Sequence, residues 1–209
     1  MSQKRNERAL KTIRHMRARQ EKQAQKIDIL CRDMVSAHAQ FSQKLAVLTF
    51  ATKFYESLLG CSGIEETLHR TVEQVRTHID HASAAIFLLD SSGFDVHVAK
   101  STDGQESIEK SHFQSWFSRE MVHQIGQTNR ICTLNDMLQM GLMAPPSALK
   151  TLSAAAIPLG RLGLGVGFIL VYRPAERPLQ PDDLSRIAAI APGIRQAILS
   201  CKSTPAPTA

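Results

Sequence analysis

The chain has 209 residues, which allows one domain with an extension or two small domains and excludes a third. With 43% hydrophobic and 21% charged residues, it can bury a core and is not disordered along its whole length. The net charge of +6 is uneven: residues 1–26 hold nine Lys or Arg against two Glu, a net +7, and the remainder carries −1. Electrostatic binding of a polyanion is therefore expected only of this basic N-terminal arm.

The cysteines indicate a reducing compartment. Cys31, Cys61, Cys132 and Cys201 are isolated from one another, with no CxxC pair and no zinc-like spacing. No apolar run approaches the length of a membrane span, and the N-terminus lacks the apolar core of a secretory signal. These features predict a soluble, cytoplasmic protein.

The first sixty residues predict one long helix. Residues 8–59 contain neither Pro nor Gly and are rich in good helix formers, and Gly60 is expected to end the helix. Apolar residues recur at steps of three and four, with Arg17 and Gln20 filling two slots. Two successive steps of four, on either side of Phe41, predict an inserted stutter.

Such a helix cannot bury its apolar stripe alone, so residues 27–60 are expected to form a coiled coil, parallel or antiparallel, in a homodimer. The residues expected at the dimer seam are Ile27, Leu30, Met34, Phe41, Leu45, Leu48 and Tyr55.

Residues 1–26 form the basic arm and have two interpretations. The arm is either a solvated, frayed helix end or a non-specific contact to an acidic membrane surface or a nucleic acid. It lacks interleaved aromatic residues and has a weak apolar face, so neither base stacking nor deep membrane insertion is supported.

Residues 61–202 predict an α+β domain, followed by a disordered tail at 203–209. The pattern predicts an antiparallel sheet with helices collected on its faces. The expected order is a helix from Ile64 to near His81, strands at 84–89 and 94–98, a helix at 113–125, a strand at 129–134, a loop at 135–151, strands at 154–159 and 166–172, and a helix that starts with Asp182 as N-cap and is kinked at Pro192-Gly193.

This order resembles the GAF domain family, small sensory domains of signalling proteins. The matching features are AAIFLLDSSG at 84–93, TNRICTLND at 128–136, Pro158-Leu159 with the glycine-led strand after it, and the acidic start of the last helix. The resemblance covers about residues 45–200 and rests on order and spacing. It implies a six-stranded antiparallel sheet, a ligand pocket between the sheet and the 113–125 helix, and dimerisation through the first and last helices.

No catalytic constellation stands out, so the chain is expected not to be an enzyme. The glycines at 160, 163, 165 and 167 precede a strand and do not fit a phosphate loop; a turn and a closely packed strand account for them. The histidines at 69, 78 and 81 lack the partners of a metal site. Cys132 and Ser153 have no evident base nearby.

The predicted pocket residues are Trp116, Phe117, Arg119, Arg130, Cys132 and Met137, chosen for their positions in the expected fold. The resemblance also speaks against two ligands. The chain lacks the Asn-Lys and Asp-Glu pairs of the branch that binds cyclic GMP, and Cys132 is followed by Thr133 rather than by the histidine of bilin-binding members. The identity of any small-molecule ligand stays open.

Two functions follow as hypotheses. The first is a non-enzymatic sensory or regulatory dimer in signal transduction, which passes ligand or partner binding through the coiled coil to a separate output protein. The second is a structural or adaptor dimer with an empty or self-filled pocket, docked to a membrane or nucleic acid by residues 1–26.

Overall fold

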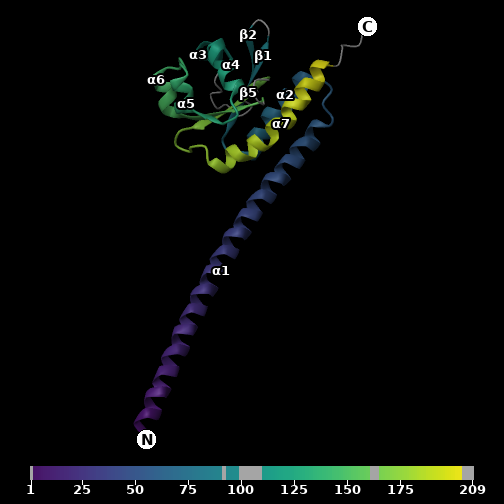
Figure 1. The fold of residues 1–209 in the computed structure, drawn as a ribbon. Coiled ribbons are helices and arrows are strands. Elements are labelled where there is room, and N and C mark those ends of the chain that lie inside the picture. The colour runs from purple at the N-terminus through teal and green to yellow at the C-terminus, as the bar shows by residue number, and fades with distance from the viewer. Residues whose placement is uncertain (1, 91–92, 99–109, 161–164, 204–209) are drawn as a thin grey trace. The chain divides into compact units, whose positions relative to one another are not determined.

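The computed structural model describes residues 2–90, 93–98, 110–160 and 165–203 and has an α+β architecture (Figure 1). Five strands form one antiparallel sheet, and helices lie on both of its faces. The elements are α1 (Ser2–Leu58), α2 (Ile64–His78), β1 (Ser83–Asp90), β2 (Gly93–Val98), α3 (Lys110–Trp116), α4 (Arg119–Gln127), β3 (Cys132–Thr133), α5 (Leu134–Gln139), α6 (Pro146–Thr151), β4 (Leu152–Pro158), β5 (Gly167–Pro174) and α7 (Pro181–Ser203).

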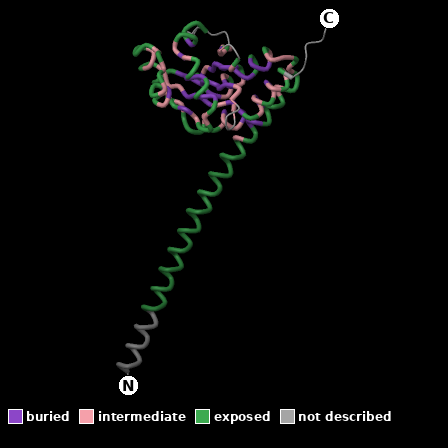
Figure 2. Tube along the Cα trace, turned by 45° about the horizontal axis from the view of Figure 1, so that its top comes forward, coloured by how far each residue is buried: buried purple, intermediate pink, exposed green. Residues whose placement is uncertain are grey.

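The chain divides into two compact units, residues 1–46 and residues 47–209. In the first unit, α1 is a lone helix whose side chains from 14 to 46 are all exposed (Figure 2). The predicted long helix is thus confirmed. The second unit, called the body here, includes the last turns of α1, which the sequence analysis assigns to the coiled coil.

The sheet has the strand order β2-β1-β5-β4-β3, and every neighbouring pair is antiparallel. Alternate residues of a strand point to opposite faces, and in β1 and β5 both sets are buried. This explains why the two strands read as continuous apolar runs. The sheet is therefore the middle layer of the body.

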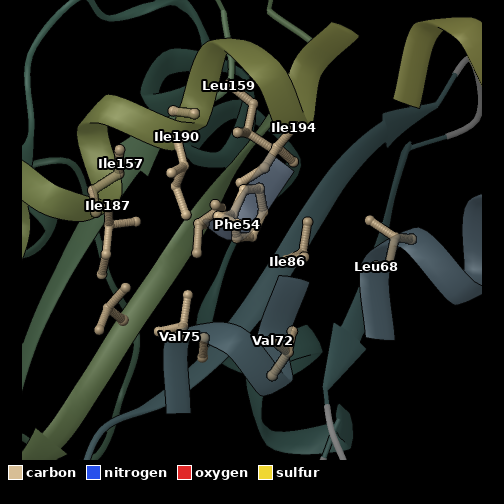
Figure 3. Close-up of a cluster of buried hydrophobic side chains, with 14 of the residues drawn as sticks. Phe54, Leu68, Val72, Val75, Ile86, Ile157, Leu159, Ile187, Ile190 and Ile194 are labelled. Atoms are coloured by element: carbon tan, nitrogen blue, oxygen red, sulfur yellow. The ribbon is translucent and has the colours of Figure 1, made fainter. Parts of the chain in front are cut away.

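One face of the sheet is covered by the end of α1 together with α2 and α7. Phe54, at the end of α1, is fully buried and lies among Ile190, Ile194 and Leu159 (Figure 3). Phe50 and Ala51 belong to the same cluster. Of the predicted seam residues, Tyr55 donates a hydrogen bond to the carbonyl oxygen of Ala189 in α7, whereas Ile27 to Leu48 are exposed. The sequence analysis missed the face of α1 that packs into the core.

The six-stranded sheet implied by the resemblance is wrong for the described residues, which form five strands. Residues 110–151 lie between β2 and β4 and fold into four helices and the two-residue strand β3. Only Cys132 and Thr133 pair with β4 before α5 begins, because Thr133 already serves as the N-cap of that helix.

Three predicted elements differ in detail. The helix expected at 113–125 is two helices, because Ser118 accepts a hydrogen bond from the Met121 amide and starts α4 afresh. The loop expected at 135–151 contains α5 and α6. The last helix begins at Pro181 rather than with Asp182 as its N-cap, and it continues through Pro192.

Glycines allow α4 to approach the β4–β5 connection closely. A Cβ on Gly160 would lie 2.7 Å from the carbonyl oxygen of Gly126, and one on Gly165 would lie 2.6 Å from it. A real Cβ does not come so near a backbone oxygen. Close packing therefore accounts for these two glycines, as predicted, whereas Gly163 lies outside the described residues.

Arg173 ties the end of β5 to the start of α7. It is only 9% exposed; its guanidinium donates to Asp183 Oδ2 at 3.1 Å and to the carbonyl oxygens of Pro178 and, at 3.4 Å, Asp80. A charge-assisted bond of this kind is stronger than a neutral one, and it holds the acidic first turn of α7 in place.

Replacing Arg173 by Met should lower the free energy of unfolding of the body by about 2 kcal/mol, because Asp183 loses its buried partner. Arg177→Met is the matched control, since Arg177 is exposed in the same connection. Equilibrium unfolding in urea measures both. Equal stabilities of the two variants would contradict the role given to Arg173.

Candidate functional site

The second face of the sheet holds a small apolar cavity of about 30 Å³. It lies between the strands β4 and β5 and the helices α3, α5 and α6. Its lining is formed by Phe113, Trp116, Phe117, Leu134, Met137, Leu142, Ala144, Ala148, Leu149, Leu152, Ala154, Leu170 and Tyr172. This is the side of the sheet where the resemblance placed a ligand pocket.

The cover of the cavity is built by local sequence signals. Thr133 and Asp136 form a reciprocal capping box that starts α5, and the hydrogen bonds from Thr133 lower the pKa of the Asp136 carboxyl. Pro146 occupies the first turn of α6, where its missing amide proton costs nothing. Both short helices are thereby fixed at their N-terminal ends over the cavity.

An aromatic cluster packs beside the cavity and contributes Phe113, Phe117 and Tyr172 to its lining. Phe87 of β1 stacks on Phe168 of β5 with ring centroids 4.4 Å apart, and Phe117 packs 4.7 Å from Phe87. Phe113 approaches Tyr172 at 5.5 Å. These rings fill most of the space between sheet and helices, which leaves a cavity with room for about one water molecule.

The structure brings three of the six predicted pocket residues together at the cavity: Trp116, Phe117 and Met137. Cys132 is fully buried in the same core cluster but does not line the cavity, and its thiol lies 3.6 Å from Thr128 Oγ1. Arg119 and Arg130 lie elsewhere, at two separate surface grooves.

Tyr172 is the polar residue that the sequence analysis missed. It is 5% exposed and lines the cavity, and its hydroxyl makes no hydrogen bond within the described part of the chain. Burial raises its pKa to about 12; Ser83 lies near enough to oppose this shift, without reaching hydrogen-bond geometry, and Arg76 opposes it as well. Its position in an apolar run gave no signal of this role.

Tyr172→Phe should leave the free energy of unfolding at neutral pH unchanged or raise it by up to about 1 kcal/mol, because it removes a buried, unpaired hydroxyl. The unfolded pKa is near 10 and the folded pKa about 12, so the protonated phenol favours the folded state and stability is lost as pH rises through that interval. Between these two pKa values the Tyr172→Phe variant should lose less stability than the wild type. Unfolding curves at neutral and alkaline pH, with absorbance titration of tyrosinate, measure both effects.

Ionisable groups elsewhere form local pairs. On β2, His97 lies 3.2 Å from Asp95 and 3.5 Å from Glu65 of α2. The ammonium of Lys110 donates to Asp95 at 2.7 Å, and this bond is the main cause of the lowered pKa of Asp95. Among the described residues no group of three or more His, Cys, Asp or Glu could hold a metal ion.

The three histidines considered as metal ligands have separate surroundings. His69 pairs with Glu73 at 3.2 Å, one turn along α2. The ring of His78 contacts the carbonyl oxygen of Gln74 and packs against Phe50. His81 adopts a positive φ of 56° in the turn before β1.

Comparison with solved structures identifies the fold. The GAF domain of Acinetobacter phosphoenolpyruvate-protein phosphotransferase aligns with a TM-score of 0.55 and 12% identity, over 76% of this chain and 96% of that chain. The GAF domain/HD domain protein of Geobacter sulfurreducens aligns with a TM-score of 0.52 and 14% identity, over 69% of this chain and 97% of that chain. The chromophore-binding domain of the Stigmatella aurantiaca bacteriophytochrome (Thr289His mutant) aligns with a TM-score of 0.53 and 13% identity, over 75% of this chain and 60% of that chain.

No family model matches the sequence, and a search of curated proteins finds no match. The body nevertheless has a GAF-like fold, which confirms the fold resemblance drawn from the order of the sequence features. In the described ranges no helix is both long and apolar enough to cross a bilayer.

Proposed function

We propose that the chain is a non-enzymatic sensory or regulatory module that works as a homodimer, with the GAF-like body as receiver and α1 as transmitter. The observation that carries this proposal is an apolar cavity under a two-helix cover, in a body that resembles sensory domains of signalling proteins. Among the described residues that line it, Tyr172 is the one titratable group, which favours binding over chemistry.

The cavity is too small in this state for a metabolite, because small-molecule sites usually enclose about 300–1,000 Å³. A ligand would therefore have to displace α6 and the segment before it. Met137 of α5 lines the cavity and Met140 follows α5, and methionine adapts readily to a changed shape. In this proposal a ligand enters the cavity only when the cover formed by α5 and α6 moves. The displacement of this cover is the change that is transmitted.

A native mass spectrum of the gently purified full chain tests ligand and stoichiometry together. A dimer that carries a discrete extra mass is the expected result. Ala148→Trp, which places a large ring in the cover, should remove that mass and leave the dimer intact. A wild-type dimer without extra mass would argue against the sensory function and for the adaptor described below.

The dimer is tested on the seam of α1. Ile27→Glu with Met34→Glu should convert the full chain to a monomer in sedimentation, because both side chains are more than half exposed in one chain and would carry buried charges in a pair. Ser36→Glu with Gln40→Glu adds the same charge away from the seam and should stay dimeric. A dimer in the first variant would place the interface elsewhere.

The small cavity favours a second candidate, a structural or adaptor dimer whose pocket is filled by its own side chains. Residues 1–26 would then dock the dimer on an acidic membrane or a nucleic acid; the described side chains of Arg14, Arg17, Arg19, Lys22 and Lys26 are all exposed. Deleting residues 1–26 should abolish binding to anionic vesicles or duplex DNA at low salt. Unchanged binding would exclude docking through the arm.

A further inference from the structure

The apolar stripe of α1 fits one uninterrupted heptad pattern if Cys31 and His38, rather than Leu30 and Ala37, occupy the seam. Steps of three and four then alternate without a break from Leu10 to Leu59, and the stutter disappears. The seam positions become Leu10, Ile13, Arg17, Gln20, Ala24, Ile27, Cys31, Met34, His38, Phe41, Leu45, Leu48, Thr52, Tyr55 and Leu59.

The seam positions from Arg17 to Thr52 are exposed in the single chain, whereas Tyr55 donates a hydrogen bond to the carbonyl oxygen of Ala189 in α7. Ile27, Met34 and Phe41 are 58%, 73% and 62% exposed, and every described side chain from 14 to 46 is exposed. An isolated helix gains no packing energy from its apolar face, and this stretch has no other part of its own unit to pack on. A partner must therefore supply that packing.

We propose that a second copy of this chain lies along α1, parallel and in register, with the heptad seam defined above. The proposal rests on the homodimer proposed above and adds direction and register. Among the residues that flank the seam, Leu30 at position g and Val35 at position e are large, apolar and 66% and 69% exposed. They are five residues apart, the spacing at which g of one chain meets e of the other in a parallel, in-register pair.

The remaining flanking positions agree with this alignment. It pairs Met16 with Glu21, Gln23 with Asp28, Ala37 with Ser42 and Lys44 with Thr49, so none of these contacts joins two like charges. An antiparallel pair would bring g to g and e to e, so no antiparallel alignment places Leu30 against Val35. The parallel alignment covers both residues at once.

One consequence is specific enough to test. Cys31 occupies a core position of the seam and would face Cys31 of the second copy, whereas Ser36 lies on the outer side of the helix. Cys31 is an exposed free thiol in the single chain, so a reagent can reach it before the dimer closes or as it opens.

The experiment is cross-linking of the purified full chain with a short bis-maleimide, read by denaturing electrophoresis next to sedimentation of the same sample. Wild type should give a covalent dimer that Cys31→Ser reduces at least tenfold. Cys31→Ser with Ser36→Cys should not restore it, whereas Cys31→Ser with Ile27→Cys should, because Ile27 is a neighbouring seam position. These results together support a parallel, in-register pair.

Other outcomes separate the two proposals. A dimer in sedimentation without a Cys31 or Ile27→Cys cross-link would overturn the parallel register and leave the homodimer standing. A monomer at all concentrations would overturn both.

A pair of neighbouring variants distinguishes the two seams directly. In the continuous pattern, His38→Leu puts an apolar residue at a core position and should tighten the dimer about tenfold, which equals about 1.4 kcal/mol. Ala37→Leu lies beside the seam and should change the dissociation constant less than threefold. Sedimentation over a concentration series measures both dissociation constants. If Ala37→Leu tightened the dimer more than His38→Leu, Ala37 would be the seam position, and the pattern with the stutter would replace the continuous one.

Discussion

Gly167→Ala is expected to prevent the body from folding, with a loss of more than about 4 kcal/mol in the free energy of unfolding. Gly167 has φ +146°, a conformation that disfavours any residue with a Cβ. A Cβ at this position would also overlap the carbonyl oxygen of Phe87. Neither atom can move cheaply, because β1 and β5 are paired at this point in the middle of the sheet.

Gly93→Ala is the matched control, because Gly93 also begins a strand but has open space where its Cβ would lie. Soluble expression, far-ultraviolet circular dichroism and urea unfolding compare the two variants. We expect Gly93→Ala to lie within about 1 kcal/mol of wild type. A folded Gly167→Ala protein of normal stability would show that the connection between β4 and β5 is arranged differently.

Phe54→Ala should cost about 4 kcal/mol in the free energy of unfolding of the body. Its ring is fully buried between α7 and the sheet, so truncation removes a large apolar contact and leaves a cavity. Lys53→Ala is the control, because Lys53 is exposed, precedes Phe54 in the same helix and lies outside the seam. Calorimetry or urea unfolding measures both variants. Equal losses would contradict the packing of the end of α1 into the body.

Much of the fold could be predicted from sequence because its signals are local. The absence of Pro and Gly predicts α1, and the apolar run 84–89 predicts β1. The break at Ser118 could not be predicted in the same way, since apolar spacing continues across it and only the side-chain cap reveals two helices. A serine such as Ser118 can lie inside a helix or cap one, and only its backbone and hydrogen-bond geometry distinguish the two roles.

The burial of α1 shows a different difficulty. Phe50 and Phe54 share the last turns with Leu48 and Tyr55, so the helix carries apolar residues on two sides. Periodicity finds a stripe but does not say which stripe meets the chain's own core. The seam taken from sequence is exposed up to Leu48, and the side that carries Phe50 and Phe54 became visible only through tertiary contacts.

The candidate site was predictable in location but not in content. The order of elements placed it between the sheet and the 113–125 segment, where the cavity lies. Trp116, Phe117 and Met137 follow from that placement. Arg119 and Arg130 do not, because Arg119 begins α4 on its outer side and Arg130 lies in the bend between α4 and β3, and sequence alone did not fix which residues point inward.

The two edges of the sheet limit how copies of this protein can meet. An exposed strand edge offers unpaired amides and carbonyls to another chain and can lead to aggregation. At one edge, β3 has two residues before α5 takes over the backbone. At the other, β2 carries Asp95 and His97, whose charge and polarity discourage pairing with a second strand. Self-association through strand addition is thereby disfavoured.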